Sequence, residues 1–201
     1  MTVMANNISD TRKFEVKTPE VTVQVSPECA ELVETKMIDG VPCLVIPMTG
    51  DVEVNGCTIA QFYPFDGRRA TAIGIVPPIL NLKVVNSIVT GYHDDEVVWT
   101  SPKNDEVCNF SFDHCVLRTE KMNTEDSLKF TNVVYENLKD TTQFGEKHFR
   151  LFDTDNLKYD FRLRKESAAI GVADTATSFP TDRRGVLRDD KPDAGCYEFD
   201  E

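Results

Sequence analysis

The 201-residue sequence lacks several features that define whole classes of proteins. No apolar run reaches about 18 residues, the length that a membrane-spanning helix needs. The start, MTVMANNISDTRKFEVK, has no apolar stretch of the kind found in a signal peptide. Basic residues are few, because 22 Lys and Arg stand against 34 Asp and Glu and give a net charge of −12. A surface this acidic repels phosphate backbones, so we expect no nucleic-acid partner. The lack of a long apolar run predicts no membrane span.

Cysteine spacing gives no sign of a metal centre. No CxxC pair occurs, and the spacings match no common zinc pattern. Free cysteine is among the most buried residue types. We therefore favour small buried thiols over disulfides or a metal role for the six residues, which are Cys29, Cys43, Cys57, Cys108, Cys115 and Cys196.

Helical periodicity is nearly absent, and the best candidate is the short stretch 28–36. Short runs rich in Val and Phe, separated by Gly, Pro, Asn and Asp, instead predict strands throughout the chain. The class is therefore expected to be all-β. The predicted strands are KFEVK (13–17), VTVQV (21–25), CLVI (43–46), DVEV (51–54), LKVV (82–85), EVVW (96–99) and FSF (110–112).

Four segments repeat one pattern: VEVNGCTI (52–59), LKVVNSIV (82–89), FSFDHCVL (110–117) and KFTNVVY (129–135). Each places apolar residues around a polar Asn or His that precedes a small residue or Val. We expect an extra residue, Gly56, to form a bulge in the first repeat. The small residue or Val that follows the polar residue recurs at spacings of 30, 28 and 18 residues. The aligned positions are Asn55, Asn86, His114 and Asn132, followed by Cys57, Ser87, Cys115 and Val133.

These spacings predict a parallel β-solenoid with loops of varying length, in which equivalent residues stack about 4.8 Å apart. An Asn at a corner can bind backbone groups of adjacent turns that the bend leaves unpaired. A β-sandwich is the alternative, and it explains the strands but not the aligned step from Asn to a small residue.

The C-terminal sequence TDRRGVLRDDKPDAGCYEF (181–199) resembles the closing motif of right-handed parallel β-helix proteins. Cys196 stands where that motif has Ala. Upstream, YDFRLRKESAAIGVAD (159–174) is similar to another segment of the family, although Ala168 and Ala173 replace its Pro and Gly. The matching positions of the closing motif are Thr181, Asp182, Gly185, Arg188, Pro192, Asp193, Gly195, Tyr197 and Glu198.

The resemblance covers about residues 50–201 and extends to coils of large exported proteins from polysaccharide-using Gram-negative bacteria. It implies a right-handed parallel β-helix, export, often as a surface lipoprotein, and usually a longer chain. This chain then looks like a C-terminal piece or a truncated copy. We expect an uncertain N-terminal segment or first coils at 1–48, coils at 49–166 and an irregular C-terminal cap at 167–201.

The cap residues are Asp182, Arg188, Asp193 and Tyr197. An Arg between two Asp residues can pin an irregular tail through charge-assisted hydrogen bonds. We expect the tail to cover an open sheet edge that otherwise invites strand addition, with Tyr197 covering the last coil.

The β-helix fold hosts lyases, glycosidases, adhesins and other proteins, so fold alone assigns no reaction. Asp94, Asp95 and Glu96 are candidate Ca²⁺ ligands, but successive strand residues point to opposite faces. We favour a solvated loop there and expect no cofactor. Arg68 and Arg69 are candidates to grip a sugar carboxylate.

Aromatic residues near those arginines, Phe62, Tyr63 and Phe65, are candidates to stack on a sugar ring, although packing between coils is the simpler interpretation. His114 is interpreted as a corner residue, and His148 has no partner at motif spacing apart from Glu146. We therefore expect a monomeric, non-catalytic, exported or cell-surface β-helix protein that associates with polysaccharide. The alternative is a polysaccharide lyase or glycoside hydrolase, which convergent carboxylates plus a Lys or Arg on one exposed face would favour.

Overall fold

The structure is a computed structural model that describes residues 14–17, 22–38, 40–47, 50–62, 71–123, 125–140 and 142–200. The chain divides into two compact units, Met1–Thr49 and Gly50–Glu201. The described residues are mostly β, with only short 3₁₀ helices, which confirms the expected all-β class. Within these residues, no helix has the length and apolar character needed to cross a membrane.

The N-terminal unit contains two antiparallel hairpins, β1–β2 and β3–β4. The best helix candidate, 28–36, is helical only in part, because a 3₁₀ helix ends at Leu32 and strand β3 begins at Glu34. The β-branched residues Val33 and Thr35 favour extended backbone, which accounts for the early switch. The elements are β1 (Phe14–Lys17), β2 (Thr22–Val25), η2 (Pro27–Leu32), β3 (Glu34–Ile38) and β4 (Val41–Val45).

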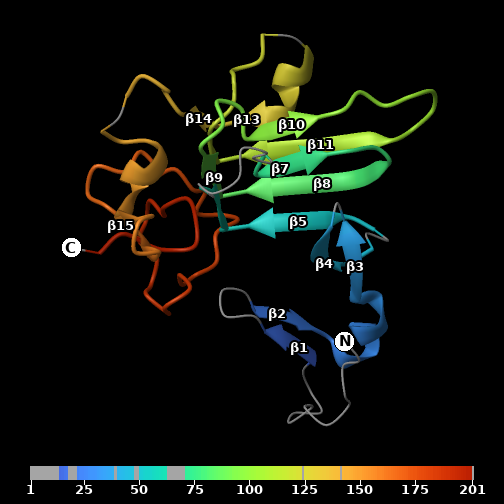
Figure 1. Cartoon of the computed structure of the whole chain (residues 1–201). Helices are drawn as coiled ribbons and strands as arrows, with labels where there is room; N and C mark the ends of the chain where they lie inside the picture. Colours follow the sequence, from blue (N-terminus) through green and yellow to red (C-terminus); the bar gives the residue numbers. More distant parts are fainter. Residues whose placement is uncertain are drawn as a thin grey trace. The chain divides into compact units, whose positions relative to one another are not determined.

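Three parallel sheets organise the second unit. Their strand orders are β13-β11-β8-β5, β14-β12-β9-β6 and β10-β7. The chain enters the three sheets in the same order in the first two repeats, whereas the last two repeats contribute strands only to the first two sheets. Strands β5, β8 and β11 run side by side (Figure 1). The strands are β5 (Val52–Asn55), β6 (Thr58–Gln61), β7 (Ile73–Ile75), β8 (Ile79–Val85), β9 (Ile88–Gly91), β10 (Val97–Trp99), β11 (Cys108–Asp113), β12 (Val116–Leu117), β13 (Phe130–Thr131) and β14 (Val134–Tyr135).

Apolar residues in register form the core between these sheets. Val54, Val84, Phe112 and Phe130 occupy equivalent positions in one sheet. The rings of Phe112 and Phe130 stack with centroids 5.3 Å apart. Val84 and Phe112 are completely buried, whereas Val54 in the first repeat is only partly buried. The core residues are therefore most completely buried in the middle repeats.

The corner between the first two sheets is a single residue with positive φ in every repeat. Gly56, Asn86, His114 and Asn132 have φ of 61°, 52°, 50° and 50°. Gly tolerates this conformation, and Asn and His are enriched in it. The expected alignment is therefore corrected in the first repeat: Gly56 is the corner residue and no insertion, while Asn55 pairs with Val85.

The residues after the corner lie in one register. The structure places Cys57, Ser87, Cys115 and Val133 directly before β6, β9, β12 and β14. The carbonyls of Cys57, Ser87 and Cys115 each accept a backbone N–H from the next repeat at 2.9 Å. Ser87 and Cys115 are fully buried. Cysteines 57, 108, 115 and 196 are free thiols.

Parallel pairing within the described residues ends at β14, earlier than the expected boundary at residue 166. Strands β15 and β16 instead form an antiparallel hairpin, whose Phe149, Phe152, Tyr159 and Phe161 rings pack together. A hairpin needs only a short turn, whereas a parallel return needs a long crossover. The remaining elements are η3 (Glu125–Lys129), η4 (Gly145–His148), β15 (Phe149–Asp153) and β16 (Lys158–Leu163).

The irregular C-terminal segment packs along the outer face of a parallel sheet. Ala169 and Ala194 contact a buried cluster that contains Ile88 and Val116 from successive strands. The N–H of Gly195 donates to the carbonyl of the corner residue Asn86 at 2.8 Å. These contacts differ from the expected cover over a sheet edge, because they involve side-chain faces and corners of several repeats.

Charged side chains hold this segment, but their pairing differs from the expected one. Arg188 donates to the carboxylate of Glu198 at 2.8 Å and to the backbone carbonyls of Asp193 and Gly195 at 2.7 Å. The carboxylate of Asp182 instead pairs with Arg184. The Tyr197 ring, which was expected to cover the last coil, lies beneath Arg184 at 5.6 Å.

Candidate functional site

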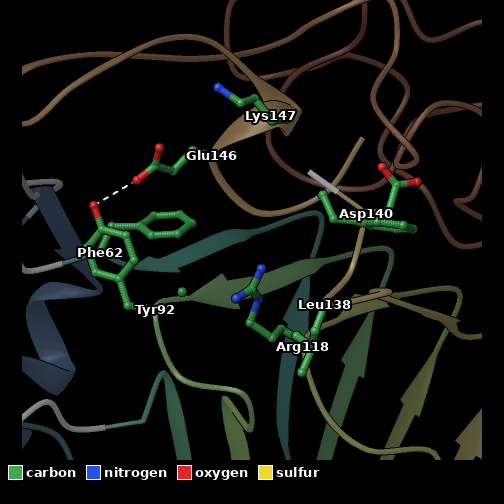
Figure 2. A pocket seen from close by; sticks show the side chains of 9 residues that line it. Phe62, Tyr92, Arg118, Leu138, Asp140, Glu146 and Lys147 are labelled. Carbon is green, nitrogen blue, oxygen red and sulfur yellow. Dashed lines mark hydrogen bonds between the residues drawn. The ribbon is translucent and has the colours of Figure 1, made fainter. Parts of the chain in front are cut away.

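A pocket of about 190 Å³ lies where three parallel strands end. Phe62 and Tyr92 follow the ends of β6 and β9, and Arg118 follows β12. Because the carboxyl ends of parallel strands meet at one edge, these side chains come together from three repeats. The opposite wall comes from the loop between β14 and β15, which supplies Leu138, Asp140, Phe144, Glu146 and Lys147 (Figure 2).

Aromatic rings form one side of the pocket. The Phe62 ring contacts the Tyr92 ring edge-on with a centroid distance of 5.0 Å, and it contacts Phe152 at 4.7 Å. The Tyr92 hydroxyl donates a hydrogen bond of 2.7 Å to Oε1 of Glu146, which ties the two walls together (Figure 2). Tyr92 therefore presents a ring of fixed position with a carboxylate beside it.

Arg118 carries positive charge into the pocket from a buried network. Its Nε donates to Oε2 of Glu136 at 2.7 Å, and Oε1 of Glu136 lies 3.0 Å from Nε2 of His148. Nδ1 of His148 lies 2.8 Å from the hydroxyl of Ser167. Burial opposes charge on Glu136, but the hydrogen bond and charge of His148, together with hydrogen bonds from Thr90 and Arg118, outweigh it and keep the pKa of Glu136 below its usual value.

The network has the residue types of a hydrolytic triad without the access that one needs. His148 is fully buried and Ser167 is 6% exposed. The Ser167 hydroxyl also accepts the N–H of Ala169 at 3.2 Å. Since neither Glu136, His148 nor Ser167 lines the pocket, their role is to fix Arg118 and the loop that carries Glu146 and Lys147.

Glycine is required at two places around the network. A Cβ on Gly145, which has φ of 63°, would lie 2.9 Å from a guanidinium nitrogen of Arg118. A Cβ on Gly91 would lie 2.0 Å from Oε1 of Glu96. The close approach of Arg118 and Glu96 to the backbone therefore depends on the absence of these side chains.

The acidic cluster considered from the sequence does not converge. Asp94 is exposed, and the carboxylate of Asp95 accepts a hydrogen bond from the Thr119 hydroxyl. Glu96 is fully buried and accepts backbone N–H groups of Ala72 and His93 at 2.8 Å. Across the described ranges, no group of three or more His, Cys, Asp and Glu side chains could hold a metal ion.

Of the other sequence candidates, Phe62 lines the pocket. Tyr63, Phe65, Arg68 and Arg69 lie outside the described residues. Sequence reasoning missed Arg118, Glu136 and the pairing of His148 with Ser167. The one available signal was the position of Ser167 within the matched C-terminal pattern, because residues 118, 136, 148 and 167 share no short motif.

Comparison with known proteins reaches only the start of the chain. A family described as "Domain of unknown function (DUF4317)" matches residues 1–57. That stretch spans the N-terminal unit and strand β5, and it contains none of the pocket residues. No match was found among curated proteins or among solved structures.

Proposed function

We propose that residues 50–135 form coils of a right-handed parallel β-helix. The support is the shared strand order of the three sheets and the corner residue of positive φ that recurs in four repeats. Residues 181–199 resemble the closing motif of right-handed parallel β-helix proteins, and this resemblance is the basis for proposing a right-handed helix. Circular dichroism and a crystal structure of the full chain would test this fold.

We further propose that the chain is a non-catalytic, exported or cell-surface protein that binds carbohydrate. The observation that carries this function is the pocket at the strand ends, in which aromatic rings stand beside carboxylates and cations. Sugar rings present apolar C–H faces to aromatic side chains and hydroxyl groups to charged ones. Export rests on the family resemblance, and cell fractionation would test it.

Lys147 is the sharpest probe of this function. Its side chain is exposed at the pocket and has no ion-pair or hydrogen-bond partner in the described part of the chain. A free ammonium group can donate to sugar hydroxyls or to a uronic-acid carboxylate. Lys139 lies in the same loop, is also exposed and does not line the pocket, so it provides a matched control.

The test is calorimetric titration with neutral and uronic-acid oligosaccharides. We expect Lys147→Ala to weaken binding about tenfold, which corresponds to about 1.4 kcal/mol. Lys139→Ala should leave the affinity unchanged. Equal effects of the two variants, or binding of no saccharide by the unaltered protein, would refute the proposal.

A polysaccharide lyase or glycoside hydrolase is the second candidate. Asp140 and Glu146 line the same pocket as Arg118 and Lys147, which is the combination that such an enzyme needs. Against it, hydrogen bonds from Thr142 hold the pKa of Asp140 below its usual value, whereas a general acid needs a raised pKa. Release of reducing or unsaturated sugar ends that is lost in Glu146→Gln would establish the enzyme instead.

A further inference from the structure

A second pocket, of about 400 Å³, lies at the end of the β15–β16 hairpin. Arg150 and Leu163 come from the two strands, and Phe199 and Asp200 come from the C-terminal segment. The turn that follows β16 supplies Arg164, Lys165 and Glu166. Leu163 is 1% exposed and forms an apolar wall with Phe199. Three of these seven residues are cationic and two are acidic, although the chain as a whole carries a net charge of −12.

One of the two acidic side chains, Asp200, is already neutralised. Asp200 receives Arg150 on one oxygen and Arg184, at 2.6 Å, on the other. The hydrogen bond from Arg184, aided by the charges of Arg150 and Arg162, holds the pKa of Asp200 below its usual value. With Arg184 included, four cations (Arg150, Arg164, Lys165 and Arg184) stand against the carboxylates of Asp200 and Glu166, so the charge around the pocket is positive.

Two cations at the pocket have side-chain donors that make no hydrogen bond within the described residues. Arg164 forms an ion pair with Glu166 at 3.7 Å, a distance longer than a hydrogen bond. Lys165 is exposed and has no ion-pair partner within the described ranges. The turn that carries both is fixed, because the N–H of Arg164 donates to the carbonyl of His148 at 2.9 Å and its carbonyl accepts the N–H of Ser167 at 3.0 Å.

We propose that this pocket binds an oxyanion, a carboxylate or a sulfate ester, carried by a saccharide chain. The planar guanidinium of Arg164 can hold two oxygens of such a group, and Lys165 adds a third donor. The wall of Leu163 and Phe199 removes water from one side and strengthens the attraction. The site is separate from the pocket at Tyr92, and it rests on the proposed function only for the saccharide that carries the charge.

The experiment titrates the full chain at physiological salt with oligosaccharides of sulfated dextran, of polygalacturonate and of neutral dextran. The test variant is Arg164→Ala/Lys165→Ala. The control is Lys103→Ala/Lys121→Ala, which removes the same charge from exposed positions outside both pockets. The test and control variants are each also combined with Lys147→Ala. The combination separates binding at this pocket from binding at the pocket beside Tyr92.

We expect the test variant to lose at least tenfold in affinity for one or both charged probes, in the presence and absence of Lys147→Ala, while the control variant keeps it. Loss for the sulfated probe alone assigns a sulfate ester, and loss for polygalacturonate alone assigns a carboxylate. Equal loss in test and control variants, or binding of neutral dextran as tightly as the charged probes, would overturn the proposal.

Discussion

The parallel repeats and the irregular C-terminal segment satisfy their backbones by different means. In the repeats, strands pair with strands, and rungs of Val and Phe fill the space between the sheets. In residues 164–200, carboxylates and guanidinium groups bind the backbone directly. Asp182 alone accepts N–H groups from Arg184, Val186 and Glu198.

This difference implies different sensitivities. Apolar burial is non-directional and depends weakly on pH, whereas a buried charge contributes only while its partner is present and correctly ionised. The repeats should therefore respond to changes of volume, and the C-terminal segment should respond to changes of charge. The following predictions test that contrast.

The largest effect should follow removal of residues 181–201. The deletion uncovers the outer face around Ile88 and Val116, which Ala194 covers in the intact protein. An exposed apolar sheet face promotes association. We expect aggregation and a lower melting temperature, measured by light scattering and calorimetry. A monomeric truncated chain with unchanged melting temperature would show that the segment contributes nothing to the fold.

Phe112→Ala tests the repeats. Phe112 is fully buried and stacks on Phe130, so its truncation should lower the free energy of unfolding by about 3–5 kcal/mol. Leu80→Ala on the same sheet should cost under about 1 kcal/mol, because Leu80 is 55% exposed. Urea unfolding of both variants at two pH values checks the size of the effect and its independence of pH.

Arg188→Ala is the matching test of the C-terminal segment. The side chains of Arg188 and Glu198 are each 6% exposed, so removal of the arginine leaves a buried carboxylate and two carbonyls without their donor. We expect a loss of about 3 kcal/mol in the free energy of unfolding. Arg183→Ala, at an exposed neighbour, is the control. Equal stabilities of the two variants would contradict a structural role for the ion pair.

Asn86→Ala tests the junction between the two regions. The Asn86 side chain accepts the N–H of Asp174 at 2.8 Å and donates to Asn55 and Thr177 at 3.0 Å. Its loss, together with the positive φ, should cost about 2 kcal/mol. Asn132→Ala shares the backbone strain but only one such bond, to Asp113, and should cost about half as much. Thermal unfolding would compare the two.

The repeats were largely predictable because their signal is local. The step from corner residue to small residue is visible in the sequence, and its spacings match the register of β6, β9 and β12. The alignment failed only at Asn55, because a Gly that follows an Asn is as good a corner as Asn itself. Strand propensity could not predict the hairpin of residues 149–163, because buried and exposed residues do not alternate regularly along its strands.

The pocket and the ion pair of Arg188 could not be predicted from the sequence, for a different reason. Arg118, Glu136 and His148 meet through the stacking of repeats, and their separations in sequence depend on loop lengths alone. Similarly, the sequence places three acidic residues near Arg188, which are Asp182, Asp193 and Glu198. Only the path of the C-terminal segment determines that Glu198 forms the ion pair.

The smallest effect, but the one that separates the regions most directly, is the pH dependence due to Asp193. Burial raises the pKa of Asp193 to about 6, with further contributions from Glu198 and Asp189, although N–H groups of Gly171 and Phe199 oppose the shift. The folded state therefore binds the proton more tightly than the unfolded state. The contribution of Asp193 to stability is complete below about pH 4 and is lost as the pH rises to about 6.

We therefore expect the free energy of unfolding to decrease across that interval in the unaltered protein and to decrease less in Asp193→Asn. Chemical denaturation at several pH values between 4 and 7 compares the two slopes, which removes any constant cost of the substitution. The slope for Phe112→Ala should equal that of the unaltered protein. If Asp193→Asn kept the full slope, the pH response would originate elsewhere, and the contrast between an apolar repeat region and a charge-held segment would lose its titratable element.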